Sequence, residues 1–324
     1  MNEPPGTRPS PSLRQALQAW LASLQLDRSL VRTGAQMLRR KLSRYGMRSQ
    51  TLEIGDFSLH LWRADAGVPL VMLHGFGASG LWQWHDQVPA LTAAGYAPVI
   101  PDLLWFGESR DKAAHFNIGR QSDAMLAMLD ALAIDRFHLA GLSYGGMIAH
   151  DLATRVQARI ASVTLVSSPG RAFMADDQRE LLADYGLDNM AELLLPHDAK
   201  GVTRLFDVAY ADPPYVPRIM RDQVIKYFYD EHRDARMQLL ASIEGDVANL
   251  RARDWVPDEP TQLIWGANDR VFPLAVTDRL LAELGEYARL TIIPDAGHAP
   301  QLERPVEFNR AWLSFLGDHP IADQ

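Results

Sequence analysis

The stretch Gly141-Leu142-Ser143-Tyr144-Gly145 decides how the rest of this sequence is interpreted. It follows the apolar run 137–140, which predicts a buried strand, and it precedes a helical pattern that begins at Gly146. Small residues around a serine at a strand-to-helix turn permit a sharp corner that lifts the hydroxyl into a cleft. The same five-residue pattern also occurs in ordinary turns. The predicted strand and helix on its two sides are what favour a nucleophilic serine here.

A serine hydroxyl is a weak nucleophile at neutral pH, so it needs a histidine base and a carboxylate that orients the base. Asp269 follows the predicted strand 262–265, and His298 follows the predicted strand 290–293. Both should therefore reach the carboxyl edge of a parallel sheet, which is where α/β folds bind ligands. Asp246 is a rival acid, but no predicted strand delivers it to that edge. The sequence thus predicts a catalytic triad of Ser143, Asp269 and His298.

A tetrahedral intermediate also needs backbone N–H groups that bind its oxyanion. His74-Gly75-Phe76-Gly77 follows the predicted strand 70–73, and its two glycines allow the backbone to turn its amides toward the serine. We expect the N–H groups of Phe76 and Tyr144 to be the two donors.

Three aromatic residues, Trp105, Phe106 and Phe173, lie on loops or helix starts that should border the cleft. They are candidates for binding the substrate. Aromatic side chains are nevertheless more often plain core residues, which is the alternative interpretation.

Beyond residue 50 the sequence alternates short apolar runs with helical stretches, after an opening hairpin that turns at Gly55-Asp56. This order predicts an α/β fold with a mostly parallel sheet covered by helices on both faces. Some ninety residues after Val166 carry helical patterns and no convincing strand, which predicts an inserted helical cap. We therefore expect an α/β core over 51–169 and 255–324, and a cap over 170–254.

Residues 1–50 differ from the rest in charge. They hold nine Lys and Arg against two acidic residues, about +7, which leaves about −15 for the remainder of a chain whose net charge is −8. Apolar residues at helical spacing predict two amphipathic helices between residues 12 and 48. Their apolar stripes would pack on the protein's own body or on a second subunit, or would lie on an anionic membrane surface.

Composition excludes several other classes of protein. The 324 residues contain no cysteine, so a disulfide framework and a cysteine-ligated metal site are ruled out. The net acidity argues against a nucleic-acid partner. The sequence has no phosphate-loop motif and no zinc-type histidine spacing, so we expect neither a cofactor nor a metal. No apolar run is long enough to predict a membrane-spanning helix, and we expect a cytoplasmic protein, with peripheral membrane contact as the variant.

The motifs described above, taken in order, resemble the α/β-hydrolase superfamily: the HGFG loop, the GLSYGG elbow, the WGANDR acid turn and the AGHAPQLERP histidine turn. The resemblance covers about residues 51–316, and it implies a serine hydrolase of the esterase or lipase kind that acts through an acyl-enzyme on a small ester with an apolar acyl group.

Two alternatives stay open. Carbon–carbon bond hydrolases of ring-cleavage products have a similar histidine segment, although they usually carry asparagine where this chain has Leu142. A ligand-binding, receptor-like member of the superfamily with a slow triad is the other alternative.

Overall fold

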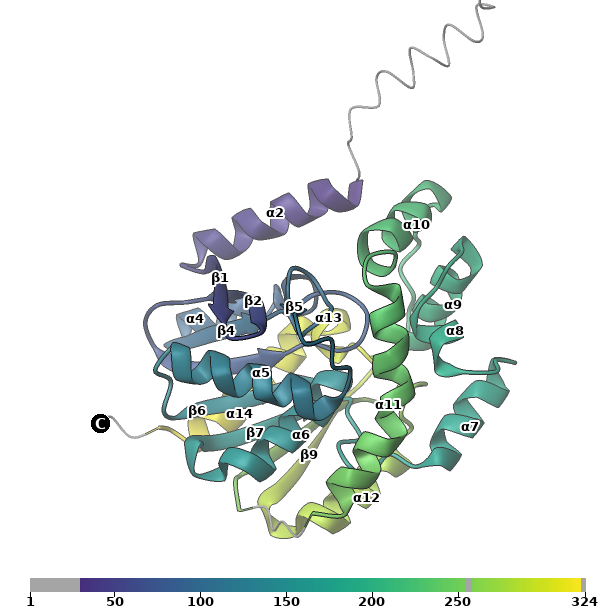
Figure 1. Ribbon diagram of the computed structural model, residues 1–324. Helices are drawn as coiled ribbons and strands as arrows, with labels where there is room; N and C mark the ends of the chain where they lie inside the picture. The colour runs from purple at the N-terminus through teal and green to yellow at the C-terminus, as the bar shows by residue number, and fades with distance from the viewer. Residues whose placement is uncertain (1–29, 254–257, 322–324) are drawn as a thin grey trace, which may run out of the picture.

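The computed structural model describes residues 30–253 and 258–321, and it is built around a nine-stranded sheet (Figure 1). The strand order is β1-β2-β4-β3-β6-β7-β8-β9, and β5 pairs with β2 outside this path. All pairings made by β2 are antiparallel, whereas β4, β3, β6, β7, β8 and β9 pair with one another in parallel, in that order. The strands are β1 (Arg48–Ile54), β2 (Phe57–Arg63), β3 (Val68–Leu73), β4 (Tyr96–Pro101), β5 (Arg110–Asp111), β6 (Phe137–Leu142), β7 (Ile160–Val166), β8 (Thr261–Gly266) and β9 (Ala288–Ile293).

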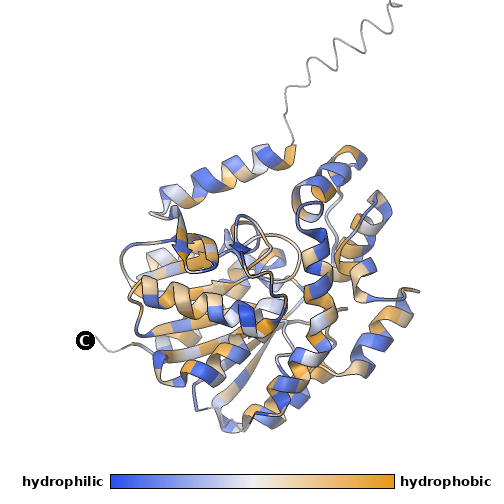
Figure 2. Ribbon diagram, viewed as in Figure 1, coloured by the Kyte–Doolittle hydropathy of each residue, from blue (hydrophilic) through white to orange (hydrophobic). Residues whose placement is uncertain are grey.

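Helices cover both faces of the sheet because successive strand residues alternate between two apolar layers. In β6, for example, Leu139 packs into one core cluster and Ala140 into the other. Figure 2 shows the apolar residues gathered on the central strands, with polar residues on the outward sides of the helices. The first face carries α5 (Ile118–Ala131), α6 (Tyr144–Val156) and α12 (Ala275–Leu284); the second carries α3 (Gly80–Trp84), α4 (Val88–Ala93) and α14 (Pro305–Asp318). Short segments complete the core: η1 (Gln157–Arg159), η3 (Gly285–Tyr287) and α13 (Pro300–Glu303).

A group of helices follows β7 and precedes β8 in the chain, and it lies to one side of the sheet (Figure 1). It consists of α7 (Ala175–Asp184), α8 (Met190–Leu194), α9 (Ala199–Ala209), α10 (Arg218–Val224), η2 (Ile225–Tyr229) and α11 (Arg233–Arg251). Its own apolar cluster includes Val202, Val224 and Tyr229. The helix α10 continues directly into the π-helical turn η2, and α11 runs for 19 residues to Arg251.

The helix α2 (Leu30–Arg44) joins this group of helices to the core. Val31 near its start is buried in the cluster of the inserted helices, whereas Leu42 near its end is buried against the core. Its apolar stripe therefore packs on the body of the protein, which was one of the expected positions for it. Arg40 and Arg44 stay exposed. The other amphipathic helix that we expected near the N-terminus lies outside the described residues. Within residues 30–253 and 258–321, no helix combines the length and apolarity that crossing a bilayer requires.

Trp312 of α14 is fully buried at the centre of the second face. Its ring lies 5.7 Å from the ring of Trp84 and 5.5 Å from that of Phe308, between centroids. Its indole Nε1 donates a hydrogen bond of 3.0 Å to Thr164 Oγ1 on β7. One side chain thus joins α14, α3 and the sheet.

We expect Trp312→Ala to lower the free energy of unfolding by about 3–5 kcal/mol, because it removes a large buried ring and leaves a cavity. Thermal unfolding followed by circular dichroism would measure the change. The control is Val306→Ala on the same helix, since Val306 is 63% exposed and its loss should leave the midpoint almost unchanged. Equal midpoints for the two variants would contradict this account of the core.

Candidate active site

Ser143 occupies the turn between β6 and α6, with backbone angles φ 51° and ψ −117°. A residue with a side chain rarely adopts a positive φ, so this conformation is strained and must be held by its surroundings. Ser143 N–H donates to the carbonyl oxygen of Val166 at 2.9 Å, and Ser168 Oγ donates to the carbonyl oxygen of Ser143 at 2.7 Å. The neighbouring strand β7 and the residues after it therefore fix the serine.

Glycines surround Ser143 because neighbouring segments leave little or no room for a Cβ atom. A Cβ on Gly145 would lie 2.4 Å from the carbonyl oxygen of His74, and one on Gly146 would lie 2.3 Å from Ser168 Oγ. The loop after β3 also lies close, since a Cβ on Gly75 would lie 3.2 Å from Ser143 Cβ. The glycine-rich sequence thus brings the His74–Gly77 loop directly against the serine turn.

His298 and Asp269 form a hydrogen-bonded pair at the same edge of the sheet. His298 Nδ1 lies 3.0 Å from Asp269 Oδ2 and 3.2 Å from Oδ1. The Asp269 side chain is buried, and its Oδ1 also accepts hydrogen bonds from the N–H groups of Val271 and Phe272, at 2.8 and 3.0 Å. The carboxylate is therefore fixed, and it can hold the imidazole with Nε2 directed away from it.

The two expected oxyanion donors lie on adjacent turns. Tyr144 is the first residue of α6, so its N–H has no acceptor within the helix. Phe76 lies in the loop that abuts Ser143, and its ring packs edge-on against that of Tyr144, with centroids 5.6 Å apart. Both N–H groups thus belong to segments that meet at the serine.

Gln83 of α3 holds the loop that carries Phe76. Its Oε1 accepts from Gly75 N–H at 2.7 Å, and its Nε2 donates to the carbonyl oxygens of Gly75 and Ala78 at 3.3 and 3.2 Å. His74 adds a second restraint, because its Nε2 accepts from Leu103 N–H at 3.0 Å and leaves Nδ1–H to donate to the carbonyl oxygen of Gly75 at 2.8 Å. Burial lowers the pKa of His74, which keeps the ring neutral.

Glu303 ties the histidine loop to the inserted helices. Its Oε1 accepts from Gly297 N–H and its Oε2 from Ala211 N–H, both at 2.7 Å. His298 N–H also donates to the carbonyl oxygen of Ala209 at 2.8 Å. Burial raises the pKa of Glu303, although the backbone donors act in the opposite direction. Neither Gln83 nor Glu303 was expected from the sequence, because their partners are backbone groups that no side-chain motif identifies.

Of the three aromatic pocket candidates, Phe106 lies in the core. It is fully buried, and its ring packs edge-on against those of His74 and Phe76. Phe173 is also buried, against Phe272, which itself contacts the His298 ring at 5.4 Å between centroids. Trp105 is partly buried among Phe116 and His232. The alternative interpretation as core residues fits Phe106 and Phe173 in this structure.

Asp246, the rival acid, serves another purpose. Its Oδ2 accepts from Ile118 N–H at 2.9 Å, at the first residue of α5, and from Ser242 Oγ at 2.8 Å. The carboxylate thus joins α11 to the start of α5.

A second histidine–carboxylate pair lies beside the site and was not expected. His60 Nδ1 lies 2.9 Å from Asp102 Oδ2, and both side chains are buried. Burial would raise the pKa of Asp102, but the hydrogen bond and charge of His60 outweigh it and lower the pKa. Asp102 also accepts from the N–H groups of Gly80 and Glu108, so it anchors α3 and the loop before β5.

Within the described residues, no group of three or more histidines, aspartates and glutamates is arranged to hold a metal ion.

Known proteins with similar sequences include enzymes of three kinds. The dihydrolipoyllysine-residue acetyltransferase component of the acetoin cleaving system from Pseudomonas putida is 31% identical, over 85% of this chain and 70% of its own. A 2-hydroxy-6-oxo-6-phenylhexa-2,4-dienoate hydrolase from Burkholderia cepacia is 28% identical, over 82% and 93%. Lipase 1 from Psychrobacter immobilis is 27% identical, over 79% and 80%.

The family model for the alpha/beta hydrolase fold matches residues 68–305, which is most of the chain. The matched region contains the serine turn, the Asp269–His298 pair and the loop that carries Phe76. Together with the sheet order and the inserted helices, this match establishes that the chain belongs to the α/β-hydrolase fold family.

Proposed function

We propose that this hydrolase is a serine carboxylic-ester hydrolase, of the esterase or lipase kind, that acts through an acyl-enzyme. In this proposal Ser143 Oγ attacks the ester carbonyl, and His298 Nε2 takes the hydroxyl proton and passes it to the leaving alcohol. Asp269 holds the imidazole and stabilises its charged form. Water activated by His298 then releases the acid from Ser143.

The observation that carries the proposal is the contact between the serine turn and the loop of Phe76. It sets two backbone segments with candidate N–H donors beside a strained serine. Attack of the serine on an ester gives a tetrahedral intermediate with a negatively charged oxygen, which such donors would stabilise. An apolar acyl group is supported by the ring of Phe272 against His298 and by the ring of Phe76 against Tyr144, the residue after Ser143.

The carbon–carbon hydrolases are the second candidate, because a relative of similar identity acts on a dienoate. Such a substrate carries a carboxylate and is cleaved next to a ketone. A vinylogous diketone bearing a carboxylate would therefore be the substrate that separates the two candidates.

Ser143→Ala should remove nearly all turnover of a p-nitrophenyl ester, by on the order of a million-fold in kcat, because the nucleophile is lost. Circular dichroism of the variant checks that it folds. A fluorophosphonate probe should label the wild type and not the variant. Wild-type ester turnover by the variant would refute the proposed nucleophile, and failure of the probe to label folded wild type would favour the receptor-like alternative.

Gln83→Met should lower kcat for the same ester by roughly tenfold or more, with little change in KM, because the loop of Phe76 loses its side-chain support. Gln83→Glu keeps the acceptor for Gly75 N–H and should recover part of the loss. The matched control is Gln238→Met, at an exposed position of α11. If Gln83→Met and the control have equal kcat, Gln83 does not position the oxyanion loop.

The ester and diketone substrates should be compared on the wild-type enzyme, across acyl chains of about two to sixteen carbons for the ester. We expect kcat/KM for the preferred ester to exceed that for the diketone. A higher value for the diketone, with weak ester turnover at every chain length, would replace the ester assignment with carbon–carbon hydrolysis.

A further inference from the structure

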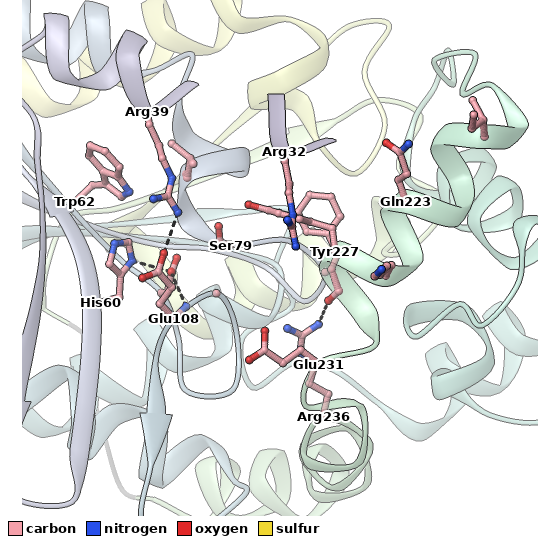
Figure 3. A pocket seen from close by; sticks show the side chains of 17 residues that line it. Arg32, Arg39, His60, Trp62, Ser79, Glu108, Gln223, Tyr227, Glu231 and Arg236 are labelled. Carbon is pink, nitrogen blue, oxygen red and sulfur yellow. Dashed lines mark hydrogen bonds and ion pairs between the residues drawn. The ribbon is translucent and has the colours of Figure 1, made fainter. Parts of the chain in front are cut away.

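A cavity of about 820 Å³ lies between α2, the inserted helices and the loop that follows Asp102 (Figure 3). Its wall includes Gly77, next to the proposed oxyanion loop, but neither Ser143 nor His298 is among its lining residues. Figure 3 shows Arg32 and Arg39 reaching into it from α2, opposite Glu231 and Arg236. The volume is that of a typical small-molecule site.

The unusual residue of this wall is Arg236, a cation that is only 4% exposed. Its Nε donates to the carbonyl oxygen of Trp105 at 2.7 Å, its Nη1 donates to that of Phe228, and its guanidinium lies 4.5 Å over the centre of the Phe106 ring. Burial lowers the pKa of Arg236 to about 10. Among the ion pairs of the described residues, none joins Arg236 to a carboxylate. A buried cation whose hydrogen bonds all go to neutral carbonyl groups is costly unless an anion reaches it.

The carboxylates of the wall already have other partners. Glu108 pairs with Arg39 at 2.8 Å, Glu231 pairs with Arg110 at 2.7 Å, and Asp102 pairs with His60. Lys226 also lines the cavity, and no carboxylate of the described chain lies within ion-pair distance of it. The cavity therefore has an excess of positive charge, although the protein as a whole is acidic.

The rest of the wall mixes polar residues, such as Ser79 and Tyr227, with apolar ones. Trp62, Leu81, Ile219 and Phe228 line it beside the charged groups. Trp62 is 4% exposed, and its indole Nε1 is buried without a hydrogen-bond partner among the described residues. A ligand that suits this wall carries an anionic group for the cations and an apolar group for the apolar part of the surface.

We propose that this cavity is a second ligand site, distinct from the ester site, which binds a carboxylate or phosphate group attached to an apolar chain. Arg236 and Lys226 bind the anionic oxygens, and the aromatic wall holds the chain. The proposal does not depend on ester hydrolysis at Ser143.

The test is isothermal titration of the full-length Ser143→Ala protein with hexyl phosphate, hexanoate, inorganic phosphate and hexanol. We expect both amphiphilic anions to bind more tightly than inorganic phosphate, and hexanol to bind most weakly. Binding should weaken as NaCl rises from roughly 50 to roughly 500 mM, since salt screens the charges. The preferred anionic group, carboxylate or phosphate, follows from the order of the first two ligands.

Lys226→Gln should weaken the binding of hexyl phosphate about fivefold, whereas Lys200→Gln, at an exposed lysine of α9 outside the cavity, should leave it unchanged. Arg236→Met should abolish the binding if circular dichroism shows that it folds, and Lys226→Gln carries the test if it does not. Equal affinities for the two lysine variants would overturn the proposal, as would hexanol or inorganic phosphate binding as tightly as hexyl phosphate. Protection of Ser143 in the wild type from the fluorophosphonate probe by hexyl phosphate would place the ligand in the ester site and overturn it too.

Discussion

The arrangement of this molecule depends on backbone segments that touch where no side chain can fit. The turn at Gly145 lies against the carbonyl oxygens of Leu73 and His74, and a Cβ on Gly266 would lie 1.9 Å from the carbonyl oxygen of Gly297. The first contact sets the serine turn against the loop of Phe76, and the second sets the acid turn against the histidine loop. Both contacts lie at the carboxyl edge of the sheet. The sheet therefore places the loops at one edge, and the glycines allow their backbones to approach one another closely.

Much of this could be predicted from the sequence because local patterns encode it. Each site motif follows a strand, and a strand's apolar pattern is visible in a few residues, so the positions of Ser143, Asp269 and His298 at one edge followed from chain order alone. The hairpin turn at Gly55 and the helix α2 were visible for the same reason. The family match and the sheet order confirm the predicted fold class.

Contacts between residues distant in the chain were not visible. His60 and Asp102 are 42 residues apart, and nothing near either one indicates the other. Arg236 lies in the stretch that predicted a helical cap, and only the structure shows that it is buried, with its guanidinium over the Phe106 ring. For the aromatic candidates, the sequence instead predicted a binding role for residues such as Phe106 and Phe173 that are buried. Their loops border the site, but whether a ring faces a cleft or the core depends on packing that no local pattern records.

Glu303 links the inserted helices to the loop of His298, the proposed general base. One carboxylate bridges Gly297 N–H, on the residue before His298, and Ala211 N–H, just beyond α9, while His298 N–H holds the carbonyl oxygen of Ala209. A displacement of residues 209–211 that is too large for these hydrogen bonds to tolerate must either break them or move His298 as well. In the proposed mechanism, the position of the inserted helices and the alignment of His298 with Ser143 are therefore coupled, so a displaced helix group would also misalign the proposed base.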